Sequence, residues 1–577
     1  MKSFQELRKL SKKSPEGARE IKIALLGDSA TQLLVTALKG TGADRGFNFD
    51  ILEADYSQIE RQILDPTSEY HSFKPDYTVI FQSTHKLLEQ YSRESRQERA
   101  SMCSRRLELV KSLATNSEGR MIYLNYPEID DAVFGSYSSK VEASFIYQLR
   151  LLNVELMKLS LALPNFTVCD LASVQAKIGR DRMYDANIYV STEMLLSLES
   201  LPLVAARIVD IIAAQSGKFK KCLICDLDNT LWGGIVGDDG WENLQLGHGL
   251  GIGTAFTELQ EWIKKLKDRG IIIAICSKND EDKAKEAFIR NPEMVLKLDD
   301  IAVFIANWDN KADNIRRIQK ILNIGMDSMV FLDDNPFERN LVRENIPEIT
   351  VPELPEDPAD YLEFLYSENL FETASYSETD SDRTRQYQIE AQRETSKINF
   401  TNEDDFLASL DMVSTVEGFT PFNTPRVAQL SQRSNQFNLR TVRYTEDEIR
   451  AIENDSRRYA TFAFSLRDKF GDNGLISVVI LEKTDADTLF VDTWFMSCRV
   501  LKRGMENFTL NAIVDYARAN GFRKIIGEYL PTPKNGMVRN HYEQLGFSPM
   551  QEAGRFLLEV DNYENKNCHI RKENGKN

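Results

Sequence analysis

The sequence predicts a multidomain α/β protein with a C-terminal domain of the α+β class. Short apolar runs alternate with amphipathic helical stretches in two successive regions, which is typical of parallel sheets covered by helices on both faces. A third region mixes several apolar runs with one long helical stretch. The length of 577 residues fits three domains, because one domain takes about 100–200 residues.

The first domain is predicted to span residues 20–215, after a polar tail at 1–19. The run "IKIALLGDSATQLL" predicts a strand, a Gly-Asp-Ser turn and a helix. Further strands are expected at "YTVIFQ", "RMIYLNY" and "NFTVCDL". Helical stretches such as "ASFIYQLRLLNVELMKLSLAL" separate them, so these strands should form a parallel sheet.

A second domain is predicted at residues 216–360 and a third at 375–560. The second has strand candidates "CLIC", "IIIAIC", "AVFI" and "MVFLDD", with amphipathic stretches between them. The segment "VPELPEDPAD", rich in proline and acidic residues, marks the boundary. The third domain has strand candidates "YATFAFSL", "LISVVILEK" and "DTLFVDTWFM". We expect the polar residues 561–577 to be disordered.

Composition excludes several classes of function. The net charge of -17 disfavours a nucleic-acid partner, which needs clustered Lys and Arg. No stretch approaches about 18 consecutive apolar residues, so no membrane span is expected. Cys222 and Cys225 have CxxC spacing, but they lie inside an apparent buried strand and have no second pair, which disfavours zinc. We expect a protein of the reducing cytoplasm.

The middle domain places two carboxylates at the end of its first strand. In "CLICDLDNT", Asp226 and Asp228 follow the strand at the edge where ligands bind in open α/β sheets. Residues two apart on an extended segment point the same way, so both can face one pocket. Such a pair suits phosphoryl transfer, with one acid attacking phosphorus and the other moving a proton.

Three further groups follow in order. Ser277 ends the strand "IIIAICS" and offers a hydroxyl donor, and Lys311 opens a helix and offers a cation near developing charge. Asp333 and Asp334 end the strand "MVFLDD". Carboxylate oxygens are what Mg²⁺ prefers, and without an ion these acids would repel a phosphate. The set therefore predicts a magnesium-dependent phosphoryl-transfer site.

This ordered set resembles the haloacid dehalogenase (HAD) superfamily, whose domain is Rossmann-like. The resemblance implies that Asp226 is the nucleophile and becomes an aspartyl-phosphate, and that Asp228 is the general acid/base. It also implies that Thr230, Ser277 and Lys311 bind phosphate, that Asp226, Asp333 and the Asp228 carbonyl bind Mg²⁺, and that Asp334 supports the metal from its second shell. The gaps from Asp228 to Ser277 and on to Lys311 leave room only for a minimal cap, which implies an open site.

Longer segments resemble the FkbH-like family, HAD subfamily IIIC. They are "DLDNTLWGGIVGDDGWENLQLG", "NWDNKADNIRRI", "FLDDNPFERNLVR", "SNQFNLRTVRYT" and "SCRVLKRGMENFTL". The resemblance implies dephosphorylation of a phosphorylated small-molecule acyl donor, 1,3-bisphosphoglycerate, and loading of a glyceryl unit on an acyl carrier protein for polyketide assembly. Relatives often carry Cys between the first two acids, where this chain has Leu227.

The third domain resembles the GNAT acyltransferases. In "RVLKRGMENFTL" a basic turn precedes a helix whose first N–H groups can bind a pyrophosphate. The resemblance implies coenzyme A or phosphopantetheine near Arg499, Arg503 and Gly504, although Lys502 replaces a signature glycine. A GNAT-shaped structural module is the alternative. In "SNQFN", Asn435 and Asn438 either line a site or cap turns.

The first domain resembles the SGNH hydrolases in "LLGDSATQ", a flavodoxin-like α/β fold, with Ser29 as candidate nucleophile. Such chemistry needs a His base, and no His lies between 150 and 215; Asp185 stands without one. A degenerate scaffold is therefore expected. Two other functions stay open for the whole chain. One is a phosphatase of a small metabolite such as a sugar phosphate, and the other is a non-catalytic scaffold that recruits a carrier protein.

Overall fold

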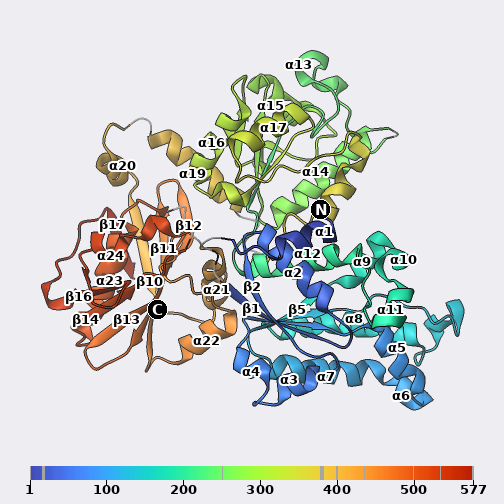
Figure 1. Ribbon diagram of the computed structural model, residues 1–577. Helices are drawn as coiled ribbons and strands as arrows, with labels where there is room; N and C mark the ends of the chain where they lie inside the picture. Colours follow the sequence, from blue (N-terminus) through green and yellow to red (C-terminus); the bar gives the residue numbers. More distant parts are fainter. Residues whose placement is uncertain are drawn as a thin grey trace. The chain divides into compact units, whose positions relative to one another are not determined.

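The computed structural model describes residues 2–15, 18, 20–249, 251–376, 383–397, 400–434, 436–497, 500–532 and 534–574. The chain divides into two compact units, Met1–Ala213 and Ala214–Asn577. Figure 1 shows the mixed α/β architecture of each unit. In the described residues, each helix is too short or too polar to span a bilayer.

Unit 1 is a parallel sheet with helices on both faces. Its strands are β1 (Glu20–Gly27), β2 (Asn48–Glu53), β3 (Tyr77–Phe81), β4 (Arg120–Leu124) and β5 (Phe166–Cys169), in the order β2-β1-β3-β4-β5. Alternate residues of β1 enter two cores, because side chains of a strand point to opposite faces. Ile23 and Leu25 pack with α2 (Gln32–Asp44) and α12 (Ser200–Gln215), while Ala24 and Leu26 pack with α7 (Met102–Asn116) and α8 (Phe145–Ala162).

The predicted polar tail at 1–19 contains a helix, α1 (Phe4–Leu10). Ser3 caps it in a capping box with Glu6. Phe4 and Leu7 are buried in the core of unit 1, so this part of the expected tail belongs to the fold. The prediction counted polar letters and passed over two apolar residues three apart, which lie on one helix face.

The middle domain, residues 218–372, is a four-stranded parallel sheet in the order β8-β7-β6-β9. The strands are β6 (Cys222–Cys225), β7 (Ile272–Ser277), β8 (Val303–Ala306) and β9 (Met329–Leu332). Helices α14 (Gly253–Asp268), α15 (Glu281–Arg290) and α18 (Tyr361–Glu368) cover one face, and α16 (Lys311–Leu322) and α17 (Pro336–Asn345) cover the other. The two central strands are buried on both faces, as the sequence predicts.

The C-terminal domain, residues 400–574, is built on an eight-stranded mixed sheet in the order β15-β16-β14-β13-β12-β11-β10-β17. Its longest strands are β11 (Tyr459–Asp468), β12 (Gly471–Lys483) and β13 (Thr488–Met496), and α23 (Met505–Ala519) packs in its main core. The other strands are β10 (Met412–Glu417), β14 (Lys524–Glu528), β15 (Ser548–Pro549), β16 (Arg555–Glu559) and β17 (Ile570–Asn574).

The expected disorder at 561–577 is wrong for residues 570–574. These residues form β17, which pairs in parallel with β10 from Met412↔Ile570 to Val416↔Asn574. Ile570 is buried in the domain core. The segment is polar because it is an edge strand, and its strand pairing comes from main-chain hydrogen bonds that a polar sequence can also make.

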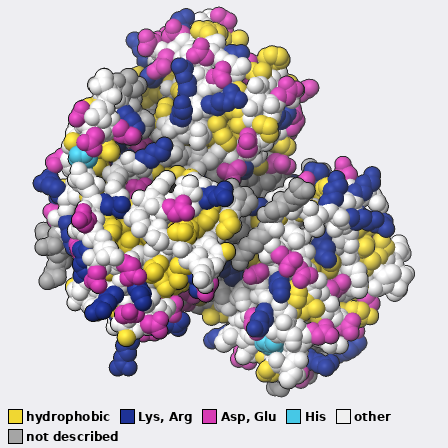
Figure 2. Space-filling model, turned by 60° about the vertical axis from the view of Figure 1, so that its left-hand side comes forward, with side chains coloured by type: hydrophobic (Ala, Val, Ile, Leu, Met, Phe, Trp, Pro, Cys, Tyr) yellow, Lys and Arg dark blue, Asp and Glu magenta, His cyan; other side chains and the backbone are white. Residues whose placement is uncertain are grey.

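Charge is dispersed on the surface that Figure 2 draws. Basic and acidic side chains alternate across that face without forming one large area of a single sign.

Candidate active site

Three parallel strands of the middle domain bring the sequence-predicted residues to one edge of the sheet. Asp226 directly follows β6, Ser277 is the last residue of β7, and Asp333 directly follows β9. In the register, Cys225 pairs with both Ile275 and Leu332. The three strands therefore end at nearly the same level, which brings these residues to one edge of the sheet.

Lys311 lies between two of the acids. Its Nζ is 2.7 Å from Asp226 Oδ2 and 2.5 Å from Asp333 Oδ2. It is the first residue of α16, which is held in place by Asn310 as N-cap. All three side chains are buried. Burial alone would lower the pKa of Lys311, but the charges of Asp226 and Asp333 raise it overall, so this lysine stays a cation.

Three carboxylates are positioned to share a cation. One oxygen from each of Asp226, Asp333 and Asp334 lies within 4.8 Å of the other two. Asp226 Oδ1 is buried and has no hydrogen-bond partner. Three carboxylates this close repel one another unless a cation neutralises them, so this donor set fits Mg²⁺, which prefers oxygen ligands.

The pKa values of these acids reflect the same crowding. Burial, together with the charge of Asp226, raises the pKa of Asp333 to about 7 in spite of Lys311. Burial also raises the pKa of Asp334. Thr230 contacts Asp334 twice, since its Oγ1 donates to Asp334 Oδ1 (3.1 Å) and accepts from the Asp334 N–H (3.0 Å). Thr230 therefore orients a carboxylate of the cluster.

Asp228 is held by three donors. Trp232 Nε1 and the Val236 N–H donate to its Oδ1 at 2.9 and 3.0 Å, and Asn279 Nδ2 donates to its Oδ2 at 2.7 Å. Asn279 is also 3.5 Å from Ser277 Oγ. Burial raises the pKa of Asp228 although these donors oppose the rise. Trp232 and Asn279 were not predicted as site residues, and only their closeness in sequence to Asp228 and Ser277 hinted at them.

A crystal structure of the N-terminal part of BF1531 from Bacteroides fragilis, which contains a phosphatase domain and is complexed with Mg, is similar to this chain. The two are 63% identical, the match covers 65% of this chain and 100% of that chain, and the TM-score is 0.64. This chain belongs to the BF1531 family. Within it, residues 22–213 match the family model described as "FkbH, N-terminal domain". Comparison with curated proteins gives no significant match.

The C-terminal domain of this BF1531-family member is similar to GNAT structures at low identity. The ribosomal-protein-S18-alanine N-acetyltransferase of Escherichia coli is 16% identical, with 26% of this chain and 94% of that chain covered and a TM-score of 0.20. The GNAT domain of PAT from S. lividans is 17% identical, with 25% and 89% covered and a TM-score of 0.20.

Ser29 in the BF1531-family chain is fully buried after β1, and its Oγ has no hydrogen-bond partner. His85 follows β3, where its ring packs against Tyr184 and Tyr189 and its pKa is lowered by burial to about 4. Asp185 caps α11 (Ala186–Thr192). The structure thus gives Ser29 no hydrogen-bonded base.

The candidate residues of the C-terminal domain have different surroundings. Arg499 lies outside the described residues, as does Asn435. Arg503 is buried and its Nη2 donates to Glu390 at 2.5 and 2.6 Å. Gly504 precedes α23 as its N-cap with φ 80°, a conformation that favours glycine. Asn438 is buried and accepts from the Thr441 N–H at 2.8 Å, so it closes a turn.

Proposed function

We propose that the middle domain is a magnesium-dependent phosphatase of the HAD type with Asp226 as its nucleophile. The observation that carries this proposal is the asymmetry of the Asp226 carboxylate. Lys311 binds Oδ2 at 2.7 Å, whereas Oδ1 is unpartnered. One oxygen is anchored by the lysine and the other keeps its lone pairs free of protein donors, which is what covalent catalysis by a carboxylate needs.

Mg²⁺ would be held by Asp226, Asp333 and the Asp228 carbonyl, with the Asp334 carboxylate close by to support the site. When bound, the ion neutralises the carboxylates and the phosphoryl oxygens so that the two negative groups can approach. The presence of Mg in the BF1531 structure supports this assignment. Lys311 stabilises charge on the phosphoryl group, and Ser277 and Thr230 lie where they can position the phosphate and the acid cluster.

Asp228 is proposed to move the proton. As an acid it protonates the leaving oxygen while the P–O bond breaks and Asp226 becomes phosphorylated. As a base it then removes a proton from the water that cleaves the aspartyl-phosphate and regenerates Asp226. Its raised pKa suits the first step, because a protonated fraction persists at higher pH than for an exposed aspartate.

The proposed substrate is a phosphorylated acyl donor such as 1,3-bisphosphoglycerate, with an acyl carrier protein as acceptor. The FkbH N-terminal domain in residues 22–213 supports this choice. The residue between the two acids, Leu227, is buried in the core, and burial raises the pKa of the neighbouring Cys225 thiol well above its usual range. Among the residues that the structure describes, the chain thus offers no reactive thiol beside Asp226, so an acceptor thiol would belong to the carrier.

The deciding experiment incubates the full chain with 1,3-bisphosphoglycerate, Mg²⁺ and a phosphopantetheinylated carrier. Phosphate release is measured together with the intact mass of the carrier, and Asp226→Asn is the matched control. Release by wild type but not by the variant supports the phosphatase, and a glyceryl adduct on the carrier adds the transfer. Release without an adduct restricts the function to hydrolysis. No release from this donor or from a panel of sugar phosphates contradicts the phosphatase and favours the carrier-recruiting scaffold.

A further inference from the structure

We infer that the C-terminal domain does not bind coenzyme A or a phosphopantetheine arm at the place its resemblance implies, because the chain's own residues fill it. That place has two parts. One is the start of α23, where a pyrophosphate would meet main-chain N–H groups. The other is the edge of β13, the strand before α23, along which an extended arm with amides would pair as an added strand.

On the side that faces β14, only the first residues of β13 have a strand partner in the described part of the chain. β13 and β14 are parallel and pair at Thr488↔Lys524, Leu489↔Ile525 and Phe490↔Ile526. β13 continues to Met496 without β14 beside it, so residues 491–496 present free main-chain groups on that side unless another segment pairs with them.

The segment 437–439 occupies that position. The Leu439 N–H donates to the Trp494 carbonyl (3.2 Å), and the Met496 N–H donates to the Phe437 carbonyl (3.0 Å). On the other side the Leu530 N–H donates to the Leu439 carbonyl (2.9 Å). The segment therefore bridges the diverging strands, and the hydrogen bonds that an amide-bearing arm would need are already made.

Side chains clamp this segment at both ends. Arg440 donates to Glu528 Oε2 (2.7 Å) and to the Asp492 carbonyl (2.6 Å), which ties it to β14 and β13. Asn535 Nδ2 donates to the Asn438 carbonyl (3.0 Å). The Phe437 ring packs edge-on against His541, with ring centroids 4.9 Å apart. Removing the segment would expose these buried groups, so it is part of the fold.

Lys502 and Arg503, which directly precede the N-cap of α23, also have partners within the chain. The Lys502 N–H donates to Glu506 Oε1 at 3.4 Å, so a main-chain donor that a pyrophosphate would need is already used. Arg503, which could offer a cation, pairs with Glu390 at 2.5 Å and lies 3.4 Å from Asp468. Arg393 completes this buried network through Asp468 (2.7 Å) and Glu390 (2.6 Å).

The network gives the basic turn a structural role instead. Glu390 and Arg393 belong to α19 (Arg383–Lys397). On the same helix, Tyr387 is buried in the core of the middle domain, and Gln388 Nε2 donates to the carbonyls of Asp299 and Ile301 at 3.1 and 3.0 Å. Arg503 therefore helps fix the helix that joins the two domains of unit 2.

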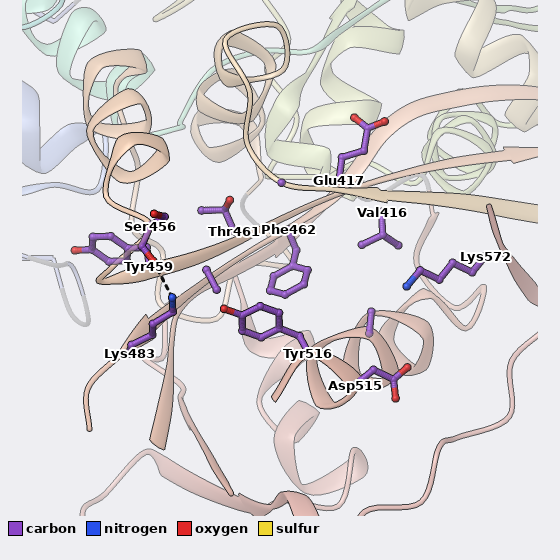
Figure 3. A pocket seen from close by; sticks show the side chains of 13 residues that line it. Val416, Glu417, Ser456, Tyr459, Thr461, Phe462, Lys483, Asp515, Tyr516 and Lys572 are labelled. Carbon is purple, nitrogen blue, oxygen red and sulfur yellow. Dashed lines mark hydrogen bonds between the residues drawn. The ribbon is translucent and has the colours of Figure 1, made fainter. Parts of the chain in front are cut away.

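A cavity of about 610 Å³ does exist in this domain, but it lies elsewhere (Figure 3). Phe462 and Tyr516 lie side by side in it, and Lys572 of β17 extends toward them. Its α23 residues are Ala512, Asp515 and Tyr516, in the second half of the helix. The residues that line the cavity do not include segment 437–440 or the first turn of α23. The cavity is therefore separate from the coenzyme A site that the resemblance implies.

Two measurements on the full chain test this inference. Isothermal titration with coenzyme A up to about 1 mM should give no binding. Hydrogen exchange should show that the main-chain amides of Leu439, Met496 and Leu530 are protected, with no change when coenzyme A is added. Saturable binding with a Kd below about 0.1 mM, or exchange of these amides as fast as in an unstructured peptide, overturns it.

A pair of variants sharpens the test. Arg440→Ala removes the clamp and should speed exchange at Leu439 and Leu530 at least tenfold. Arg457→Ala, at an exposed position before β11, is the matched control and should leave both amides unchanged. Equal exchange in the two variants contradicts a clamped segment. If Arg440→Ala does not fold, the wild-type titration and exchange still decide the question.

Discussion

Trp232 donates its indole N–H to Asp228 over 2.9 Å, from four residues further along the chain. The Val236 N–H meets the same oxygen, so both lone pairs of Oδ1 are used, while Oδ2 accepts only from Asn279. A proton on Asp228 must therefore sit on Oδ2. If Asp228 is the general acid, Trp232 positions it by fixing which oxygen faces the leaving group.

Trp232→Phe should lower kcat for an alkyl phosphate by up to about 10-fold, because one hydrogen bond contributes about 0.5–1.5 kcal/mol. The loss should be smaller for p-nitrophenyl phosphate, whose leaving group needs little proton donation. Trp262→Phe, which alters a ring packed on Tyr366 and Phe371, is the control. Equal losses for both substrates would point to a packing defect.

Asp226→Asn should reduce phosphate release by about 10²-fold or more with the fold unchanged, since the nucleophilic oxygen is replaced in a side chain of the same shape. Steady-state phosphate release and circular dichroism check this. Activity above about 10⁻² of wild type would refute the nucleophile assignment.

Lys311→Met should destabilise the middle domain by about 3–5 kcal/mol, because it leaves Asp226 and Asp333 buried without their shared cation. Urea unfolding measured without metal is the appropriate test. Lys320→Met on the same helix, at its last turn, serves for comparison. A change of the same size in both variants would show that the effect comes from the helix surface.

Mg²⁺ should raise the unfolding temperature of the wild type, because a ligand at 100 times its Kd stabilises the folded state by about 2.7 kcal/mol. The rise should be lost in Asp333→Asn and reduced in Asp334→Asn. Asp309→Asn, an exposed acid that pairs with Arg317, should keep the full rise. Equal shifts in all four proteins would place the ion elsewhere.

His541 should make the C-terminal domain sensitive to acid. It is buried between Phe437 and Trp494, and burial lowers its pKa to about 3 from an ordinary value near 6.5. Below about pH 6.5 His541 is protonated in the unfolded chain but stays neutral in the folded chain. The free energy of unfolding therefore falls as the pH falls toward about 3. Denaturant unfolding of wild type and His541→Phe between pH 7 and 4 should show a weaker dependence in the variant.

Strand geometry explains why the sequence could place three candidate site residues at one edge of the sheet. Asp226 and Asp333 directly follow parallel strands and Ser277 ends another, and such strands end together. Trp232 and Asn279 could not be predicted, because an indole in an apolar run is usually core and its contact depends on the path of the following loop. Arg503 has its partner 113 residues earlier in the chain, so the basic turn looked available for an anion.

The parallel strand β17 has a consequence for aggregation. It supplies a neighbour to β10, which lies more than 150 residues earlier in the chain. Until the two strands pair, β10 exposes an unpaired edge that another chain can bind. Deleting residues 570–574, or crowding them with a bulky group, would leave that edge open and favour aggregation.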